Sequence, residues 1–301
     1  MARVYVTGAG DRADRVRRLV EAVGLEGYSR ETVVLKANYN SADPFPASTH
    51  TGTLQALLEV LRHAGAGQVT LLERSGMGET REVLERCGVF RLLARSGARA
   101  EVLDELPAGG WVHIPAGGSH WRDGFYLPRA LLAAGRMVQT CCLKTHRFGG
   151  HFTLSLKNSV GLVARTVPGL SQDFMHELHR SPHQRLMIAE INRAYPTHLA
   201  LMDANLGFSR GGPEQGEVIR PGLMLASSDR VALDAAGVSL LRLHGATGSV
   251  SEGRVFGLEQ IARAAAIGVG VAGPGEVDVV ALDREGEEAA ARIGQLLREE
   301  G

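Results

Sequence analysis

The sequence contains little lysine. Of its 33 basic residues only Lys36, Lys144 and Lys157 are lysines, the other 30 are arginines, and asparagine occurs only five times. The formal net charge is zero, and acidic and basic residues are mixed along the chain, so no basic stripe favours a nucleic acid. Aromatic residues make up 5% of the chain and offer few surfaces for base stacking. We therefore expect no nucleic-acid partner.

Long apolar runs are also missing, and none approaches the length that spans a bilayer. The N-terminal stretch MARVYVTGAG leads directly into a strand-like run and shows no leader segment. The three cysteines, Cys87, Cys141 and Cys142, form no spaced framework, and two adjacent cysteines suit neither an ordinary disulfide nor a zinc knuckle. We expect reduced, buried and inert thiols, a cytoplasmic location and no membrane partner.

The rest of the composition, 44% hydrophobic and 22% charged, is typical of a globular protein, and 301 residues allow one or two domains. Strand-like and helix-like segments alternate, which predicts an α/β fold with a mostly parallel sheet flanked by helices. We predict a single domain over residues 1–301. Two lobes around a cleft are the alternative, with a boundary in the irregular, glycine-containing stretch 101–126.

The element boundaries follow from the apolar spacing and the turn residues. Ser227 and Ser228 are predicted to cap the helix at 229–243, with Asp229 in its first turn. Strands are predicted at residues 2–7, 31–36, 68–73, 136–145, 198–203, 222–227 and 277–283, and helices at 13–25, 52–65, 79–88, 181–196, 229–243 and the charged C-terminal segment.

A glycine-rich turn, VTGAGDRA, follows the first predicted strand and is similar to the opening of a dinucleotide-binding fold. Gly8 and Gly10 match that motif, but Ala13 occupies the third position. The second predicted strand ends in Lys36, where a ribose-binding Asp or Glu would be expected. We interpret the turn as a tight strand-to-helix connection, and a nucleotide-dependent enzyme remains a weak third hypothesis.

The rarity of lysine points to the positions that keep it. Arginine replaces lysine on most surfaces, but not where a compact ammonium enters a tight pocket or where the amine must lose a proton. Asn38 and Asn40 lie beside Lys36, and Asn158 lies beside Lys157. The lysines and these asparagines are therefore candidates for one shared site.

Strand geometry groups these residues further. Side chains alternate along an extended chain, so Lys36 and the two asparagines after it share a face, as do Lys144 and His146. Both groups end predicted strands, where α/β sheets collect their active groups. A helix beginning near Thr51 would offer free N–H groups to an anion beside His50. Each residue alone also has a structural interpretation, such as a strand end or a satisfied buried histidine, but the set together favours a site.

The sequence resembles the family called domain of unknown function 362. The resemblance is carried by VLKANYNSADPFPASTHTGTLQALLEVLRHAG, LLERSG, LKTHRFGGHFTLSLKNSVGLV, HQRLMIAEINRAYPTHLALMDANLGFSRGGPEQG and GLMLASSDRVALDAAG, in the family's order. The family's Lys-Pro-Asn has Ala37 in place of proline here, and its Thr-Thr-His is Ser48-Thr49-His50. Some relatives carry a four-cysteine ferredoxin-like segment. This chain lacks it, so no iron–sulfur cluster is expected.

The resemblance implies a pocket of lysine, amide, histidine and threonine side chains, with acidic positions at strand ends or helix starts as further members. We assign catalysis to Lys36, Lys144, His146 and Lys157, substrate binding to Asn38, Asn40, Thr49, Asn158 and Asp229, and a divalent metal (Fe, Ni, Mn or Zn) to His50, His146, Asp203 and Glu73.

Three further histidines, His176, His179 and His183, have the spacing of one helix face and could gather a metal. We favour a solvated helix face for them. His183 also matches a family histidine that precedes a helix.

Several lysines and amides around one cleft suit a small carboxylate or phosphate. We predict an enzyme acting on such a substrate by isomerase, lyase or redox chemistry, with Lys144 or His146 moving a proton. The alternative is a non-catalytic module that binds or delivers an anion, a metal or a cluster. No nucleophile elbow supports a serine or cysteine hydrolase. The plan is also similar to that of nickel-dependent lactate racemases, which use His and Lys in a cleft, and a homo-oligomer is compatible with the sequence.

Overall fold

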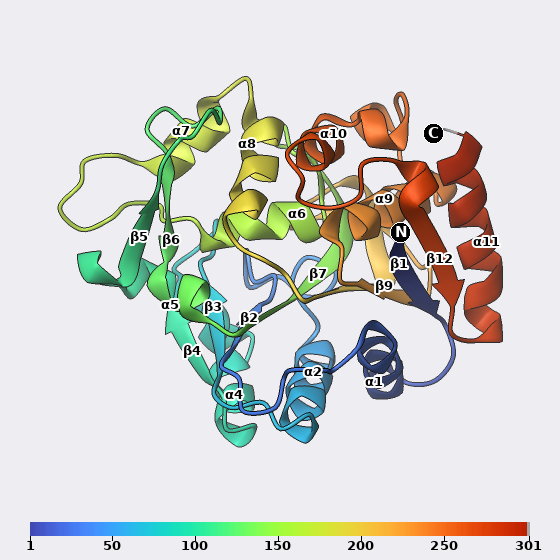
Figure 1. Ribbon diagram of the computed structural model, residues 1–301, viewed down its shortest axis with the longest axis horizontal. Coiled ribbons are helices and arrows are strands. Elements are labelled where there is room, and N and C mark those ends of the chain that lie inside the picture. Colours follow the sequence, from blue (N-terminus) through green and yellow to red (C-terminus); the bar gives the residue numbers. More distant parts are fainter. Residues whose placement is uncertain (300–301) are drawn as a thin grey trace.

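A computed structural model describes residues 1–299, and within them the chain forms twelve β-strands and eleven α-helices (Figure 1). The strands are β1 Ala2–Thr7, β2 Val33–Lys36, β3 Val69–Glu73, β4 Arg99–Val102, β5 Trp111–Ile114, β6 Phe125–Pro128, β7 Arg136–His146, β8 His151–Thr153, β9 Leu199–Gly211, β10 Gly216–Ile219, β11 Leu223–Ser227 and β12 Val277–Ala281. The helices are α1 Arg12–Val23, α2 Thr51–His63, α3 Thr80–Arg86, α4 Val89–Arg95, α5 Arg129–Ala133, α6 Ser155–Asn158, α7 Phe174–Arg180, α8 Gln184–Ile191, α9 Arg230–Leu243, α10 Glu259–Ala266 and α11 Arg284–Glu299.

Ten strands of the described chain form one mixed sheet, in the order β12-β1-β11-β9-β7-β2-β3-β4, with β8 paired to β7 and β10 paired to β9. The neighbours along this order are parallel except on the two sides of β11, which runs antiparallel to both β1 and β9. The short strands β8 and β10 are also antiparallel to their partners. The prediction of an α/β fold with a mostly parallel sheet is confirmed.

Helices cover both faces of this sheet (Figure 1). The central strands β2 and β3 are buried along their whole length, as expected for strands that are covered on both sides. One face packs on α1, α2 and α4, whose core residues include Leu19, Leu57 and Leu93. The other packs on α6, α8, α9 and α10, and α11 lies beside β12 at one end of the sheet.

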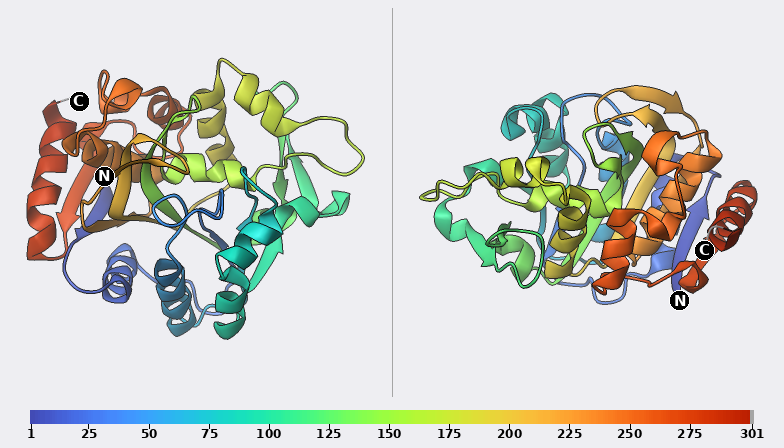
Figure 2. Two further views of the ribbon diagram at one scale, coloured as in Figure 1. Left: turned by 180° about the vertical axis from the view of Figure 1, so that it is seen from behind. Right: turned by 90° about the horizontal axis from the view of Figure 1, so that it is seen from above.

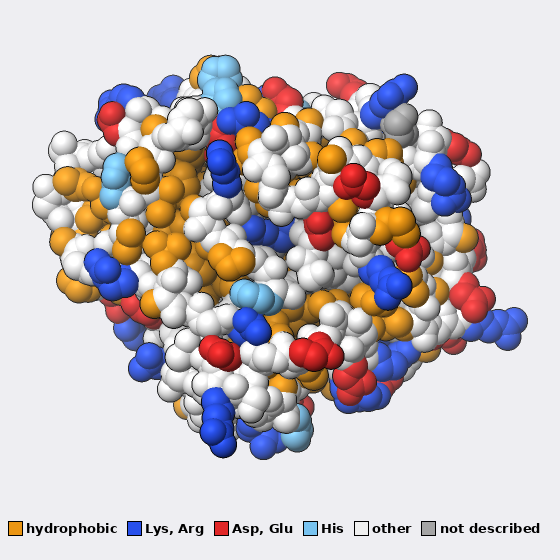
Figure 3. All heavy atoms as spheres, viewed as in Figure 1, with side chains coloured by type: hydrophobic (Ala, Val, Ile, Leu, Met, Phe, Trp, Pro, Cys, Tyr) orange, Lys and Arg blue, Asp and Glu red, His pale blue; other side chains and the backbone are white. Residues whose placement is uncertain are grey.

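A small two-stranded sheet, β5–β6, forms in and just after the stretch 101–126, which the sequence suggested to be irregular. Trp111, Phe125 and Leu127 of this hairpin pack in one core cluster with residues of α7 and α8. The hairpin lies at the opposite end of the molecule from α11 (Figure 2). Hydrophobic side chains gather over this region on the face shown in Figure 3, whereas charged side chains are scattered over the rest of that face.

The start of α9 differs from the prediction. Asp229 is its N-cap, with a carboxylate that accepts hydrogen bonds from the N–H groups of Val231 and Ala232 at 2.8 and 2.9 Å. Ser227, one of the two predicted caps, instead donates its hydroxyl to the carbonyl of Arg3 at 2.7 Å. Aspartate is a strong N-cap because a side-chain oxygen, here Oδ1, accepts hydrogen bonds from the free N–H groups of the first turn.

The cysteines are free, and no helix within residues 1–299 is long and apolar enough to cross a membrane. Cys141 and Cys142 are buried in β7, and burial raises the pKa of the Cys142 thiol to about 12. These two thiols are therefore protonated and unreactive at neutral pH, as predicted. Cys87 is only partly buried.

Candidate functional site

A cavity of about 690 Å³ lies where the carboxyl ends of β2, β3 and β7 meet α6. All three lysines of the chain line this cavity, together with Asn38, Asn40, Glu73, His146 and Asn158. In the view from behind, the loop after β2 (blue) lies near α6 (yellow-green), and both segments contribute residues to the cavity lining (Figure 2, left). The structure thus brings most of the predicted site residues to one place.

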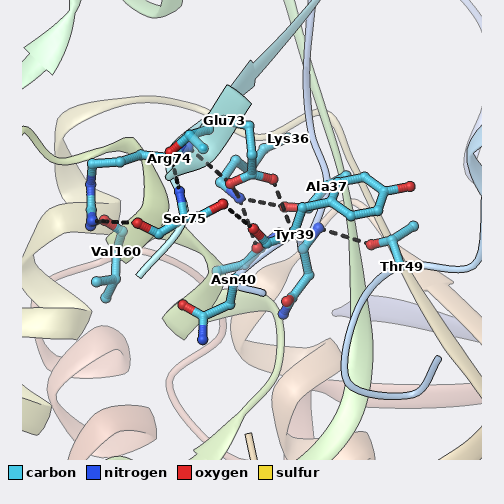
Figure 4. A network of polar contacts seen from close by, with 12 residues as sticks. Lys36, Ala37, Tyr39, Asn40, Thr49, Glu73, Arg74, Ser75 and Val160 are labelled. Atoms are coloured by element: carbon cyan, nitrogen blue, oxygen red, sulfur yellow. Dashed lines mark hydrogen bonds and ion pairs between the residues drawn. The ribbon is translucent and has the colours of Figure 1, made fainter. Parts of the chain in front are cut away.

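Lys36 and Glu73 form an ion pair at the base of this site. Lys36 Nζ lies 2.5 Å from Glu73 Oε1 and 3.3 Å from the side-chain oxygen of Asn158, and the lysine and glutamate are at most 2% exposed. Glu73 also accepts hydrogen bonds from the N–H groups of Tyr39 and Arg74 (Figure 4). Burial lowers the pKa of Lys36 and raises that of Glu73, and each charge offsets part of the other's shift. Because the carboxylate accepts hydrogen bonds on both oxygens, we assign the charged pair.

Two other buried cations lack a carboxylate partner among residues 1–299. Lys144 Nζ donates to the carbonyl of Pro213 at 3.1 Å and to that of Ala47. The Arg74 guanidinium donates to main-chain carbonyls, including that of Val163 at 2.9 Å. Carbonyl dipoles satisfy these donors but do not cancel their charge, so both cations keep the cavity positive. Burial away from water lowers the pKa of Lys144.

Lys157 is the least constrained of the three lysines. It extends from α6 with 8% of its surface exposed, and in the described chain its ammonium has no hydrogen-bond or ion-pair partner. Burial, assisted by the positive charges of Lys144 and Arg74, lowers the pKa of Lys157 to about 8. A substantial fraction of this side chain is therefore a neutral amine near physiological pH.

His146 stands next to Lys157 at the end of β7. Its Nδ1 atom is buried without a hydrogen-bond partner among the described residues, and burial followed by the charges of Lys157 and Lys144 lowers its pKa, so the ring is neutral. Both side chains flank Gly150: a Cβ atom there would lie 2.5 Å from Lys157 Cε and 3.0 Å from His146 Nδ1. Glycine at this position gives both groups room to approach each other.

The short helix α6, which carries Lys157 and Asn158, is hydrogen-bonded at its N-terminus to the neighbouring helix α9. The carboxylate of Asp234, fully buried on α9, accepts hydrogen bonds from the N–H groups of Ser155 and Leu156 at 2.7 and 3.0 Å. Burial raises the pKa of Asp234 to about 7, although these two hydrogen bonds act in the opposite direction. Asp234 therefore positions the helix without lining the cavity, and the sequence did not single it out.

The open part of the cavity contains groups that are free to bind a ligand. Arg165 is half-buried in the wall, and no described residue pairs with its guanidinium. Asn38 Oδ1 and Thr153 Oγ1 are buried in the wall without a hydrogen-bond partner within residues 1–299. Five Lys and Arg side chains line the cavity against two carboxylates, Glu73 and Asp173. The cavity is therefore suited to an anion.

Other predicted residues serve the framework instead of the cavity. His50 caps the N-terminus of α2 through its own Nδ1, and Thr49 Oγ1 accepts a hydrogen bond from the loop backbone. Asp203, 1% exposed, accepts hydrogen bonds from Arg12 at 3.0 Å and Thr53 at 2.5 Å. None of these three residues lines the cavity, and neither does the helix cap at position 229.

The four predicted metal ligands are consequently not gathered. Only Glu73 and His146 line the cavity, and the carboxylates of Glu73 and Asp203 are already paired with Lys36 and Arg12. No group of three or more His, Cys, Asp or Glu side chains within residues 1–299 is arranged to hold a metal. These residues therefore do not fit the metal site that the sequence suggested, and Fe, Ni, Mn or Zn binding stays a prediction.

The three spaced histidines do not share a helix face. His176 and His179 lie on α7, which ends at Arg180, whereas His183 caps the next helix and its ring packs on that of His120 at 4.6 Å. His176 and His179 are exposed, as the favoured interpretation expects, and both also line the cavity. The break between the two helices separates the third histidine from the other two.

The N–H groups of the glycine-rich turn after β1 are hydrogen-bonded to a side chain of the same protein, Asp283. The N–H groups of Gly8 and Ala9 donate to the carboxylate of Asp283 at 3.0 and 3.1 Å, and Arg18 pairs with the same carboxylate at 2.8 Å. A phosphate at this turn would have to displace Asp283. The turn thus has the structural role that the sequence favoured.

The candidate site lies in a region that matches a known protein family. The family model described as Domain of unknown function (DUF362) matches residues 33–239, a range that includes the three lysines and Asp234. The chain belongs to this family. A search of curated proteins gives no match.

Two solved structures show similarity to the chain. The lactate racemase apoprotein from Thermoanaerobacterium thermosaccharolyticum is 14% identical with a TM-score of 0.45, over 75% of this chain and 54% of that chain. A Thermotoga maritima protein from a structural genomics consortium is 14% identical with a TM-score of 0.41, over 69% and 52%. The chain spans about half the length of either structure, and we transfer no property from them.

Proposed function

We propose that this DUF362 protein is an enzyme that binds a small carboxylate or phosphate substrate in the cavity and moves a proton on it. The observation that carries the proposal is Lys157, an easily deprotonated amine that has no partner in the described part of the chain and lies next to neutral His146 in a cavity of about 690 Å³. A volume of this size is typical of a small-molecule site.

Substrate binding is supported by the distribution of charge. No residue within 1–299 pairs with the guanidinium of Arg165, which can hold a carboxylate or phosphate through two parallel hydrogen bonds. Lys144 and Arg74 add positive charge that no described carboxylate neutralises. An anion that enters the cavity would supply the missing negative charge.

Proton transfer is supported by the pair of Lys157 and His146. A lysine with a pKa of about 8 exchanges its proton near neutral pH, and the neutral imidazole of His146 can hold this amine by a hydrogen bond. The surrounding cations would stabilise the negative charge that develops when a proton leaves the carbon next to a carboxylate. Isomerases and lyases that act on small acids begin with such a step.

Two measurements on the full chain test the proposal. Calorimetry with inorganic phosphate, lactate, malate and pyruvate measures binding, and nuclear magnetic resonance in deuterated water measures loss of the proton next to the carboxylate. Arg165→Gln should weaken binding about 10-fold or more, because a charge-assisted pair contributes about 1.5–3 kcal/mol. Arg180→Gln, at an exposed position outside the cavity, is the matched control and should change neither signal.

The outcomes separate the hypotheses. Binding and exchange that both depend on the cavity residues support the enzyme. Binding without exchange of any substrate would favour the non-catalytic binding module. Equal affinity for these anions in wild type and Arg165→Gln would contradict the proposed site.

A further inference from the structure

We propose that the amine of Lys157 condenses with the carbonyl group of a 2-oxo carboxylate and holds it as an imine in the cavity. This inference rests on the proposed function, because the same cavity must first bind the carboxylate. It adds a substrate class and a covalent step.

Lys157 is the lysine whose amine is free to react. Lys36 is committed to Glu73, and Lys144 donates to two main-chain carbonyls. The Lys157 ammonium has neither kind of partner among residues 1–299, and it borders the cavity. Desolvation and neighbouring cations favour the neutral amine, the form that attacks a carbonyl carbon.

The choice of lysine at this position also argues for chemistry beyond charge. The chain uses arginine at 30 of its 33 basic positions, and Arg74 and Arg165 already make the same cavity positive. An arginine at position 157 would add charge but could not lose a proton to become a nucleophile. Loss of a proton near neutral pH is a property that lysine supplies and arginine lacks.

The condensation balances without any other reactant. The Lys157 nitrogen forms a bond to the carbonyl carbon, and the carbonyl π electrons move to its oxygen, which takes up the proton lost by the nitrogen. The nitrogen then loses its second proton, the hydroxyl takes up a proton and leaves as water, and a carbon–nitrogen double bond remains. His146 Nδ1, which has no partner in the described chain and lies beside Lys157 across Gly150, is placed to accept a hydrogen bond from the Lys157 amine and so to orient it.

The cavity also fits the rest of a 2-oxo carboxylate. Arg165 offers its guanidinium to the carboxylate, which is one bond away from the reacting carbonyl. Asn38 Oδ1 and Thr153 Oγ1 are buried in the wall without partners in the described chain, and they can hydrogen-bond the hydroxyl formed during condensation. The positive surroundings would draw electrons from the imine and make the adjacent carbon acidic.

Borohydride trapping tests this inference on the full chain. The protein is incubated with pyruvate or glyoxylate, reduced with sodium borohydride and analysed by intact mass and peptide mapping. The chain has three lysines, so together with the N-terminal amine only four amines compete for the label. We expect one adduct per chain at Lys157, complete loss of that adduct in Lys157→Arg, and at least a several-fold lower yield in Arg165→Gln. Arg180→Gln is the control and should trap like wild type.

Failure of the imine can be distinguished from failure of the proposed function. Pyruvate that binds by calorimetry but leaves no adduct overturns the imine and leaves the anion-binding enzyme intact. An adduct only at Lys36, Lys144 or the N-terminus also overturns it. If neither pyruvate nor inorganic phosphate binds, the proposed function itself fails. The wild-type adduct and its position decide the matter even if a variant is unstable.

Discussion

Gly150→Ala tests whether the position of Lys157 determines the rate of the proposed chemistry, with little expected effect on the stability of the fold. The new methyl group would lie 2.5 Å from Lys157 Cε, whereas an ordinary contact begins near 3.4 Å, so the end of Lys157 must move by about 0.9 Å. His146 Nδ1, at 3.0 Å, must move by a smaller amount. A displacement of about 1 Å between reacting groups can slow a reaction by about 100-fold.

The same substitution should affect stability little. Gly150 is not among the glycines with positive φ, so alanine can adopt its backbone conformation, and this class of substitution gains about 0.4–1 kcal/mol through the unfolded state. That gain offsets part of the cost of crowding, which falls on the flexible end of a lysine. We expect proton exchange and borohydride trapping to slow by about 10- to 100-fold, with Tm within a few degrees of wild type.

The assay compares three proteins under the same conditions. Exchange of the proton next to the carboxylate is followed by nuclear magnetic resonance in deuterated water, trapping by intact mass, and Tm by circular dichroism. Gly275→Ala is the matched control, because its Cβ would meet no atom within 4 Å. Wild-type rates in Gly150→Ala would refute the placement of Lys157 beside His146. A large fall in Tm would instead show that Gly150 serves the fold.

Three further predictions concern the buried charges. Isotope-labelled lysine, titrated by nuclear magnetic resonance, should show a titration midpoint near 8 for Lys157. Lys144→Met should raise this midpoint, because one neighbouring positive charge is removed. A midpoint above 10 in the wild type would refute the desolvated amine. The folded protein keeps the Asp234 proton up to about pH 7, whereas an unfolded aspartate loses it near about pH 3.9. Between these two pH values the folded state binds more protons than the unfolded state. The stability contributed by Asp234 therefore falls as pH rises. Relative to Asp234→Asn, wild type should therefore lose stability between about pH 4 and 7 in urea unfolding, and a constant difference across this range would contradict the raised pKa. Glu73→Gln leaves the Lys36 charge buried without its partner and should cost about 3–5 kcal/mol in the free energy of unfolding. The loss should be smaller when Lys36→Met is added. Additive losses in the free energy of unfolding would show that the two side chains do not interact.

The fold was predictable where apolar spacing is strong. The buried strands β2, β3 and β7 coincide with predicted segments, and so do the amphipathic helices α1 and α2. Strands β4 and β10, with the sequences RAEV and GEVI, were missed because each has only four residues and two apolar side chains, which is too short a pattern to predict a strand. The β5–β6 hairpin was missed because a stretch with many glycines gives little local signal.

The candidate site was predictable where composition singles out residues. Lysine is rare enough for its positions to carry information, and all three lysines line one cavity. Arg74 and Arg165 were missed because nothing distinguishes them from the other arginines before the chain folds. Asp234 was missed because an acidic residue inside a helix usually faces solvent, and only the packing of α9 against α6 gives it two N–H partners. The sequence offered no signal for that contact.

The central claim is that the lysine cavity binds and converts a small anion. Isotope-labelled lysine tests it most directly, because the chain yields only three side-chain signals and all come from the cavity. We predict that pyruvate or phosphate shifts the Lys157 signal of the wild type at concentrations that leave the signal of Arg165→Gln unchanged. Lysine signals that do not respond to any carboxylate or phosphate in the panel would contradict it.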